Sequence, residues 1–235
     1  MSDVTTLIAA NLSRLRERIV AAAWHSGRTA DDVTMVAVTK YVGVDEAGAL
    51  VAAGCRELGE SRPQQLWQKA EALKEQHVAW HLIGHLQRNK VRRTLPLVAM
   101  IQSADSERLI AAIDAASGEL SRTTTLLLEV NVSGEEAKHG LAPDVVESLL
   151  VRCADLEHVT IRGLMAMAGR GGGPEAARAD FARLRQLRDR LRSVCPPGVA
   201  LDELSMGMSG DFEQAIHEGA TIVRIGSALF EGIGR

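Results

Sequence analysis

Short apolar runs alternate along the chain with longer segments in which apolar residues recur every three or four positions. The short runs are typical of strands buried on both faces, and the longer segments are typical of amphipathic helices. The predicted strands are residues 33–40, 55–59, 78–84, 98–103, 123–132, 159–167, 199–206 and 221–226. The predicted helices are residues 5–25, 45–53, 63–74, 105–116, 143–153, 174–194 and 210–218.

This alternation of strands and helices predicts βα units around a parallel sheet, and eight such units close the sheet into a barrel. An open doubly wound sheet is the alternative. Such a sheet usually has about five or six strands, however, and no Gly-x-Gly-x-x-Gly motif follows the first strand here. Because 235 residues suit one undivided barrel, we predict an α/β fold, a single (β/α)8 TIM barrel, with one domain over residues 1–235.

The composition indicates the class of protein, its partners and its cellular compartment. With 46% hydrophobic residues, 24% charged residues and a net charge of −3, the chain is typical of a globular protein. The arginine-rich segment 178–192 and the basic cluster 88–93 have few aromatic neighbours, so we expect solvated faces and no nucleic acid partner. Three cysteines without a Cys-x-x-Cys pair, no export signal and no apolar run of about 18 residues favour a cytoplasmic protein without a membrane partner.

The chemistry of a (β/α)8 barrel lies at the carboxyl ends of its strands, and the loops after the last two strands often hold phosphate. Lys40 closes the first predicted strand, so its amine faces the barrel mouth, where the neutral form could attack an aldehyde. Taken alone, a lysine at this place is more simply explained as a solvated strand end.

Two further signals follow the seventh and eighth predicted strands. Ser209 precedes a predicted helix in a stretch of small residues, so open backbone N–H groups there could bind an anion, although a helix-capping serine is the simpler interpretation. Gly226 and Ser227 repeat the pattern after the last strand. Strand alternation puts Arg224 on the same side as Gly226, where it either contacts a bound ring or forms an ion pair on the barrel rim. With Lys40, these residues predict an amine and a phosphate site at one end of one barrel.

Seven ordered motifs cover nearly the whole chain, namely VAVTK at 36–40, LGE at 58–60, HLIGHLQRNK at 81–90, EVNVSG at 129–134, GLM at 163–165, LSMGMS with Asp211 at 204–211, and VRIG with Phe230 at 223–230. In this order they resemble the YggS/PROSC family of pyridoxal 5'-phosphate (PLP) binding proteins, also called PLP homeostasis proteins. The resemblance implies a barrel similar to the N-terminal domain of alanine racemase and PLP as the cofactor.

The resemblance also assigns residues to the cofactor by role. It implies that Lys40 is the Schiff-base lysine and that Met206 lines the pocket. Ser209, Gly226 and Ser227 would hold the phosphate, and Arg224 would face the pyridine nitrogen. One departure is Ser61, which stands where the family usually has an asparagine, so a ring contact by that asparagine is in doubt. His81 and His85 could suggest a metal, but no third ligand is evident and we expect no metal site.

Two classes of function fit these residues. The first is a PLP carrier or regulator that keeps the aldehyde bound without substantial catalytic turnover. The second is a racemase-like PLP enzyme, which needs a second proton-transfer group, and in alanine racemase-like enzymes that group is a tyrosine outside the barrel domain. Tyr41 is the only tyrosine, and strand alternation would point it away from Lys40. Arg224 at the pyridine nitrogen would disfavour ring protonation, which makes transaminase-like chemistry less likely.

A third and weaker alternative is a class I aldolase-like enzyme that uses the same lysine and phosphate contacts on a sugar phosphate without a cofactor. A purely structural barrel would leave the paired small-residue turns unexplained. We therefore expect PLP as the small-molecule partner, PLP-dependent apoenzymes as candidate recipients, no catalytic residue of its own, and a monomer.

Overall fold

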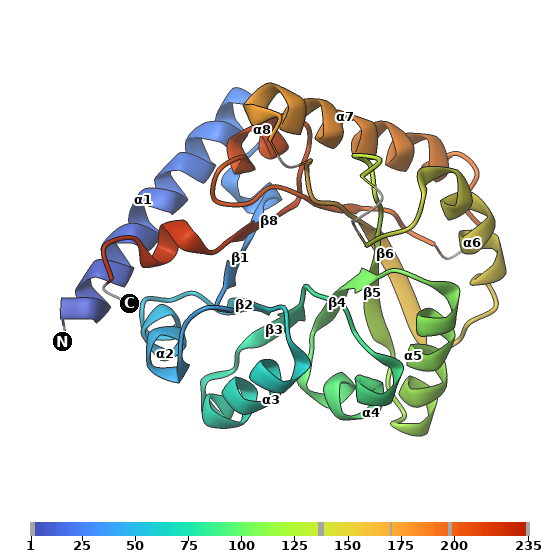
Figure 1. Cartoon of the computed structure of the whole chain (residues 1–235), viewed down its shortest axis with the longest axis horizontal. Coiled ribbons are helices and arrows are strands. Elements are labelled where there is room, and N and C mark those ends of the chain that lie inside the picture. Colours follow the sequence, from blue (N-terminus) through green and yellow to red (C-terminus); the bar gives the residue numbers. More distant parts are fainter. Residues whose placement is uncertain (1–2, 136–138, 170, 197–198, 234–235) are drawn as a thin grey trace.

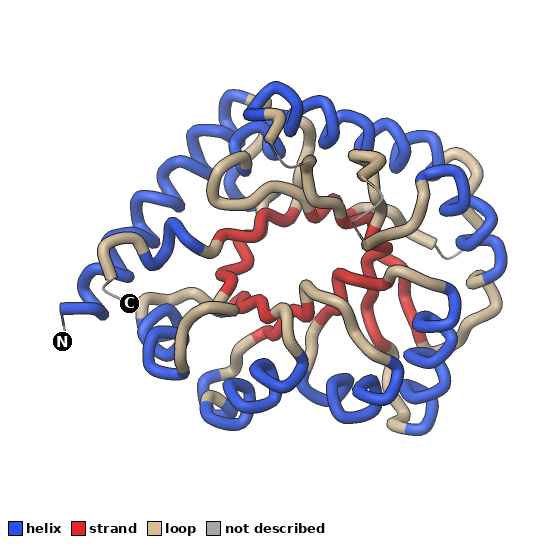
Figure 2. Tube along the Cα trace, in the orientation of Figure 1, coloured by secondary structure: helices blue, strands red, loops and turns tan. Residues whose placement is uncertain are grey.

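Eight parallel strands form a closed barrel in this computed structural model, which describes residues 3–135, 139–169, 171–196 and 199–233. The strands are β1 (Thr34–Val38), β2 (Glu57–Glu60), β3 (Ala79–Leu82), β4 (Met100–Ala104), β5 (Thr124–Glu129), β6 (Val159–Met165), β7 (Glu203–Ser205) and β8 (Ile222–Ile225). Each strand pairs with the next, and β8 returns to β1 with Ile225 opposite Ala37. Figure 2 shows the strands as a central ring with helices outside it. The predicted (β/α)8 barrel is confirmed.

The helices cover the outside of this barrel (Figure 1). The α-helices are α1 (Asp3–His25), α2 (Val44–Ala52), α3 (Pro63–Ala72), α4 (Val91–Thr94), α5 (Glu107–Glu119), α6 (Val146–Arg152), α7 (Gly173–Arg192) and α8 (Phe212–His217). Short 3-10 turns are η1 (Ala30–Asp32), η2 (Lys74–Gln76), η3 (Arg88–Lys90), η4 (Leu95–Leu97), η5 (Pro143–Val145) and η6 (Ser227–Phe230). Within the described ranges, no helix combines the length and the apolar character needed to cross a membrane.

The first helix is tied to the segment that follows the last strand. Asn11 Nδ2 donates to the carbonyl oxygens of Leu229 at 3.1 Å and Glu231 at 2.9 Å. Figure 1 accordingly shows α1 alongside the red C-terminal segment, with both termini on one side of the barrel. These bonds hold the loop after β8 in place from the outside.

Apolar side chains fill two layers because side chains alternate along each strand. A small cluster of Val36, Leu127, Met165 and Ile222 joins strands from opposite sides of the barrel, so it lies inside. The much larger cluster lies between the strands and the surrounding helices. Polar side chains also face the barrel interior, and they form part of the candidate site.

Several strands end earlier than the apolar runs that predicted them. β1 stops at Val38, so Lys40 lies in the turn after it, and β7 covers only the end of the predicted segment 199–206. Apolar residues beyond a strand end can be buried by helices without joining the ladder, and periodicity does not separate the two cases. The short helix α4 was not among the predicted helices, because four residues are too few to give a helical period.

Candidate functional site

Lys40 extends from a turn that buried hydrogen bonds hold in place. Just before it, the Thr39 N–H donates to the Gly59 carbonyl at 3.0 Å, and the Thr39 hydroxyl donates to Glu60 Oε1 at 2.7 Å. The Thr39 carbonyl accepts from Lys69 Nζ at 2.7 Å. Lys69 also forms an ion pair with Glu60, and the two side chains are 5% and 0% exposed. These contacts fix the backbone at the mouth of the barrel, and Lys40 itself is half-buried there.

Tyr41 lies beside the Lys40 amine. Lys40 Nζ is 5.0 Å from the centroid of the Tyr41 ring, which is a cation–π distance. The expectation that these two side chains point apart is therefore wrong. The reason is that β1 ends at Val38, so the alternation of a strand does not continue into the turn.

Two backbone N–H groups after β8 converge on one hydroxyl oxygen. Gly226 N and Ala228 N donate to Ser209 Oγ at 3.2 Å and 3.3 Å. Gly226 also adjoins β1, since a Cβ at this position would lie 3.5 Å from Val38 Cβ. Paired backbone donors aimed at one oxygen are suited to a phosphate oxygen. The loops after β7 and β8 thus meet next to the strand that leads into Lys40.

Ser209 is not the cap of the helix that follows it. Asp211 is the N-cap residue of α8, and its Oδ1 accepts from Met208 N at 2.5 Å. The capping interpretation of Ser209 is therefore wrong, and its hydroxyl bonds the loop after β8 instead. Ser227 is exposed, and so is the apolar side chain of Met208 next to Ser209.

A chain of hydrogen bonds crosses the barrel interior from Arg224. Arg224 Nη1 donates to Ser205 Oγ at 2.6 Å, and the Ser205 hydroxyl donates to Gln102 Oε1 at 2.6 Å. Gln102 Nε2 then donates to His81 Nδ1 at 2.9 Å, and His81 Nε2 lies 2.7 Å from Glu57 Oε2. An amide nitrogen can only donate, so His81 Nδ1 accepts from Gln102, and each of these contacts can join a donor to an acceptor.

This chain links the carboxyl end of the barrel to its opposite end. Glu57 is the first residue of β2, and it lines a hollow of about 430 Å³ beside α1. Arg224 is 4% exposed, and its Nη2 donates to the Ala166 carbonyl at 2.9 Å. Its direct partners are thus a hydroxyl and a carbonyl, which does not fit the alternative of an ion pair on the barrel rim.

The charges around Arg224 decide how it titrates. Burial lowers the pKa of Arg224 to about 10, and the negative charges of Glu129 and Asp211 act in the opposite direction. Burial likewise raises the pKa of Asp211, against the bond from Met208 and the charge of Arg224. At neutral pH the guanidinium therefore keeps its charge inside the barrel.

Met206 directly follows β7 and is fully buried in the large apolar cluster. Its place in the pocket wall stays a prediction. Ser61 is half-buried, and its carbonyl abuts Gly84, where a Cβ would lie only 2.4 Å from that oxygen.

The two histidines considered for a metal face different surroundings. His81 belongs to the interior chain, whereas His85 lies at the mouth with its Nδ1 2.8 Å from Asp105 Oδ2. The His85 ring stacks on the ring of His139, with centroids 5.4 Å apart. Burial raises the pKa of the nearby Glu129, and the negative charge of Asp105 adds to this effect. His85 therefore has partners that its spacing from His81 did not reveal.

Comparison with known proteins agrees with the barrel fold and shows its family. The alanine racemase N-terminal domain family model matches residues 10–233, so the fold and the match define a (β/α)8 barrel of the alanine racemase N-terminal class. A pyridoxal phosphate homeostasis protein from Aquifex aeolicus (strain VF5) is 40% identical over 219 residues, covering 93% of this chain and 95% of that protein. The chain belongs to the pyridoxal phosphate homeostasis protein family, as the motifs indicated.

Solved structures resemble the chain over almost its whole length. PipY from Synechococcus elongatus PCC7942, in a structure with PLP bound, has a TM-score of 0.85 and 34% identity, covering 95% of this chain and 99% of that chain. A crystal structure of an unknown protein from Bifidobacterium adolescentis has a TM-score of 0.92 and 37% identity, covering 97% of both chains.

Proposed function

We propose that this chain binds PLP at the barrel mouth as a Schiff base on Lys40 and takes part in PLP homeostasis without substantial catalytic turnover. The observation that carries the proposal is the convergence of the Gly226 and Ala228 amides next to the strand that leads into Lys40. The names of the relatives and the PLP bound to PipY support the same ligand.

The residues at the mouth fit an aldehyde that carries a phosphate. The amides of Gly226 and Ala228 now share one oxygen, Ser209 Oγ, and would bind a phosphate oxygen in its place. The hydroxyls of Ser209 and Ser227 would then donate further hydrogen bonds to the same anion. Lys40 would supply the amine that bonds the aldehyde carbon.

Arg224 argues for a carrier. PLP acts as an electron sink most effectively when its ring nitrogen is protonated. A guanidinium that stays charged at neutral pH, placed at that nitrogen, would disfavour the protonated ring. The hydrogen-bond chain through Ser205 would hold Arg224 in this position. The protein would therefore keep PLP bound while giving little help to amino-acid chemistry.

A racemase-like enzyme is the second candidate function, because Tyr41 lies next to the Lys40 amine. A phenol and an amine beside one ligand can both transfer protons. Under this alternative, Tyr41→Phe would abolish alanine racemisation and leave the absorption of bound PLP unchanged. Under the carrier proposal, neither the wild type nor Tyr41→Phe turns over.

The test compares absorption spectra of the dialysed full chain after loading with PLP. We expect an imine band in the wild type, its loss in Lys40→Ala, and its retention in Lys74→Ala, which removes a lysine whose side chain is 62% exposed. Alanine racemisation should stay at the level of Lys40→Ala. An imine band that survives in Lys40→Ala would contradict the lysine assignment, and robust wild-type turnover would contradict the carrier. A colourless protein that is labelled by a sugar phosphate on reduction would favour the aldolase-like alternative.

The proposal also covers the oligomeric state, the location and the partners of the protein. We propose one PLP-binding domain over residues 1–235 that acts as a monomer in the cytoplasm and supplies PLP to PLP-dependent apoenzymes. The free thiols of Cys55, Cys153 and Cys195 suit a reducing compartment.

A further inference from the structure

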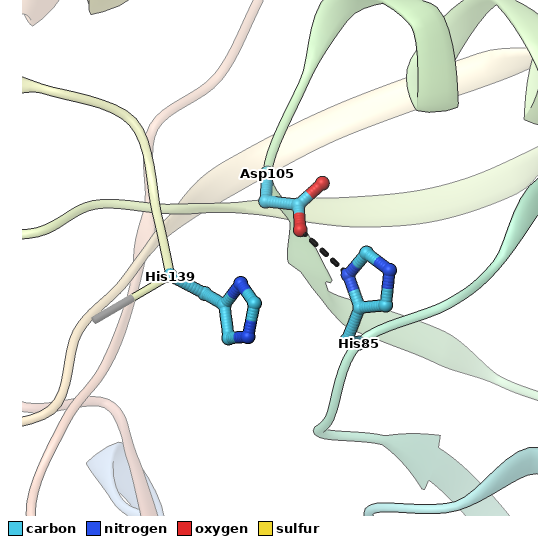
Figure 3. A group of neighbouring side chains, drawn as sticks. All are labelled: His85, Asp105 and His139. Carbon is cyan, nitrogen blue, oxygen red and sulfur yellow. Dashed lines mark hydrogen bonds and ion pairs between the residues drawn. The ribbon is translucent and has the colours of Figure 1, made fainter. Parts of the chain in front are cut away.

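Three side chains with metal-binding atoms meet at the barrel mouth, and none of them is among the proposed PLP contacts. His85 follows β3, Asp105 follows β4 and His139 lies in the loop after β5 (Figure 3). His85 Nδ1 is 2.8 Å from Asp105 Oδ2, and the two imidazole planes are 18° apart. One ligand atom from each residue lies within 4.8 Å of the other two.

The backbone around His85 is anchored on both sides. The Gly84 carbonyl accepts from Ser103 Oγ at 2.7 Å, and the close approach of Gly84 to Ser61 leaves no room for a Cβ. Leu86 on the other side is 1% exposed. Asp105 directly follows β4, and its side chain is only 11% exposed. Two of the three ligands therefore start from well-defined positions.

His139 precedes a segment that returns to the end of β5. Gly140 has a φ of +116°, and a Cβ there would lie 2.9 Å from Asn131 N, so this position requires glycine. Leu141 N donates to the Glu129 carbonyl at 2.7 Å, and Asn131 N donates to the Leu141 carbonyl at 2.9 Å. This pairing holds His139 beside His85, although the two residues are far apart in the sequence.

We propose that His85, Asp105 and His139 bind a divalent transition metal ion of the zinc or cobalt type. Two imidazoles and one carboxylate are ligands that such ions prefer, whereas magnesium and calcium favour oxygen alone. A tetrahedral ion with bonds of about 2.0–2.1 Å needs ligand atoms about 3.3 Å apart. The two exposed histidines can rotate to reach that spacing while Asp105 stays in place. Three protein ligands leave a fourth position open to water or to a ligand in the mouth.

The local charge favours a cation at this place. Asp105 has little contact with water, and the neighbouring Glu129 is only 5% exposed. A divalent ion bound by the three side chains would compensate both poorly solvated carboxylates. The inference does not depend on PLP binding, because none of its ligands is a proposed PLP contact.

The test is a calorimetric titration of Zn²⁺ into the full chain without PLP and without a polyhistidine tag. We expect one Zn²⁺ per chain in the wild type and in His25→Ala, a control that removes an exposed histidine at the end of α1. His139→Ala and Asp105→Asn should each bind at least about tenfold more weakly, since even supporting residues of metal sites cost about 10–100-fold when lost. At the same concentration, Zn²⁺ should also raise the unfolding temperature of the wild type by more than that of His139→Ala.

The absorption spectrum of bound Co²⁺ shows whether a cysteine is among the metal ligands. Bound Co²⁺ should give visible ligand-field bands without a thiolate charge-transfer band, because no cysteine belongs to the cluster. A thiolate band would assign the ion to a cysteine and contradict the proposal. No saturable Zn²⁺ binding by the wild type, or equal affinity in His139→Ala and His25→Ala, would contradict it as well. His139 is exposed, so its replacement should leave metal-free stability at the wild-type level, and this keeps the comparison valid if Asp105→Asn fails to fold.

Discussion

Ser205→Ala removes one oxygen from the middle of the hydrogen-bond chain inside the barrel. Ser205 is fully buried, accepts from Arg224 and donates to Gln102, both at 2.6 Å. Alanine fills nearly the same volume, so the main effect is that two buried polar partners lose a contact. The cost of the substitution therefore measures the support that the chain gives to Arg224.

The expected cost follows from the charge of one partner. A hydrogen bond to a charged group contributes about 1.5–3 kcal/mol, and an unsatisfied buried neutral group costs about 1–3 kcal/mol. Arg224 keeps its bond to the Ala166 carbonyl. We therefore expect Ser205→Ala to lower the free energy of unfolding by about 2–4 kcal/mol. Ser117→Ala is the matched control, since Ser117 is also fully buried but bonds the neutral hydroxyl of Thr124 at 2.7 Å, and it should cost about 1 kcal/mol.

Urea unfolding of both variants at neutral pH measures this difference. After loading with PLP, Ser205→Ala should also alter the absorption of the bound ring, because the position of Arg224 changes, whereas Ser117→Ala should not. Equal losses of stability in the two variants, with identical spectra, would refute the reasoning that the chain supports Arg224.

Three further predictions concern pH, thiol reactivity and close packing. Burial raises the pKa of Glu129, so the unfolded chain loses the proton of this carboxyl group at a lower pH than the folded chain does. The contribution of Glu129 to the free energy of unfolding therefore falls as pH rises above about 4.3. Glu129→Gln should therefore gain stability relative to the wild type between pH 4 and pH 7 in urea unfolding, and a constant difference would argue against it. Burial raises the pKa of Cys55 to about 11, so mass spectrometry should find alkylation first at the less buried Cys195, and earlier labelling of Cys55 would contradict this. Gly84→Ala should lower the free energy of unfolding by about 1–3 kcal/mol, because the new Cβ would clash with the Ser61 backbone. Gly226→Ala has room for a Cβ and should cost less, and equal losses of stability would contradict the packing argument.

The barrel and part of its mouth could be predicted because both follow from chain order. Strand alternation placed Arg224 inside, and the loops after the last two strands brought Ser209 to Gly226 as the rule for such barrels requires. Strand alternation gave a wrong prediction for Tyr41, because β1 ends before Lys40. Tyr41 lies beside Lys40 and does not point away from it.

The interior hydrogen-bond chain could not be predicted, because it depends on the register between strands. Glu57, His81, Gln102 and Ser205 come from four strands, and none of them has a partner nearby in the sequence. The neighbours of His85 were missed for the same reason. A pattern along one segment shows which face a residue occupies, but not which residue lies across the barrel.

The central claim is that the amine of Lys40 forms the covalent bond to PLP. Borohydride reduction of the PLP-loaded chain, followed by peptide mapping, tests this claim most directly. The account predicts one modified peptide that carries the label on Lys40. A label on another lysine, such as the buried Lys69 behind the same turn, would contradict it.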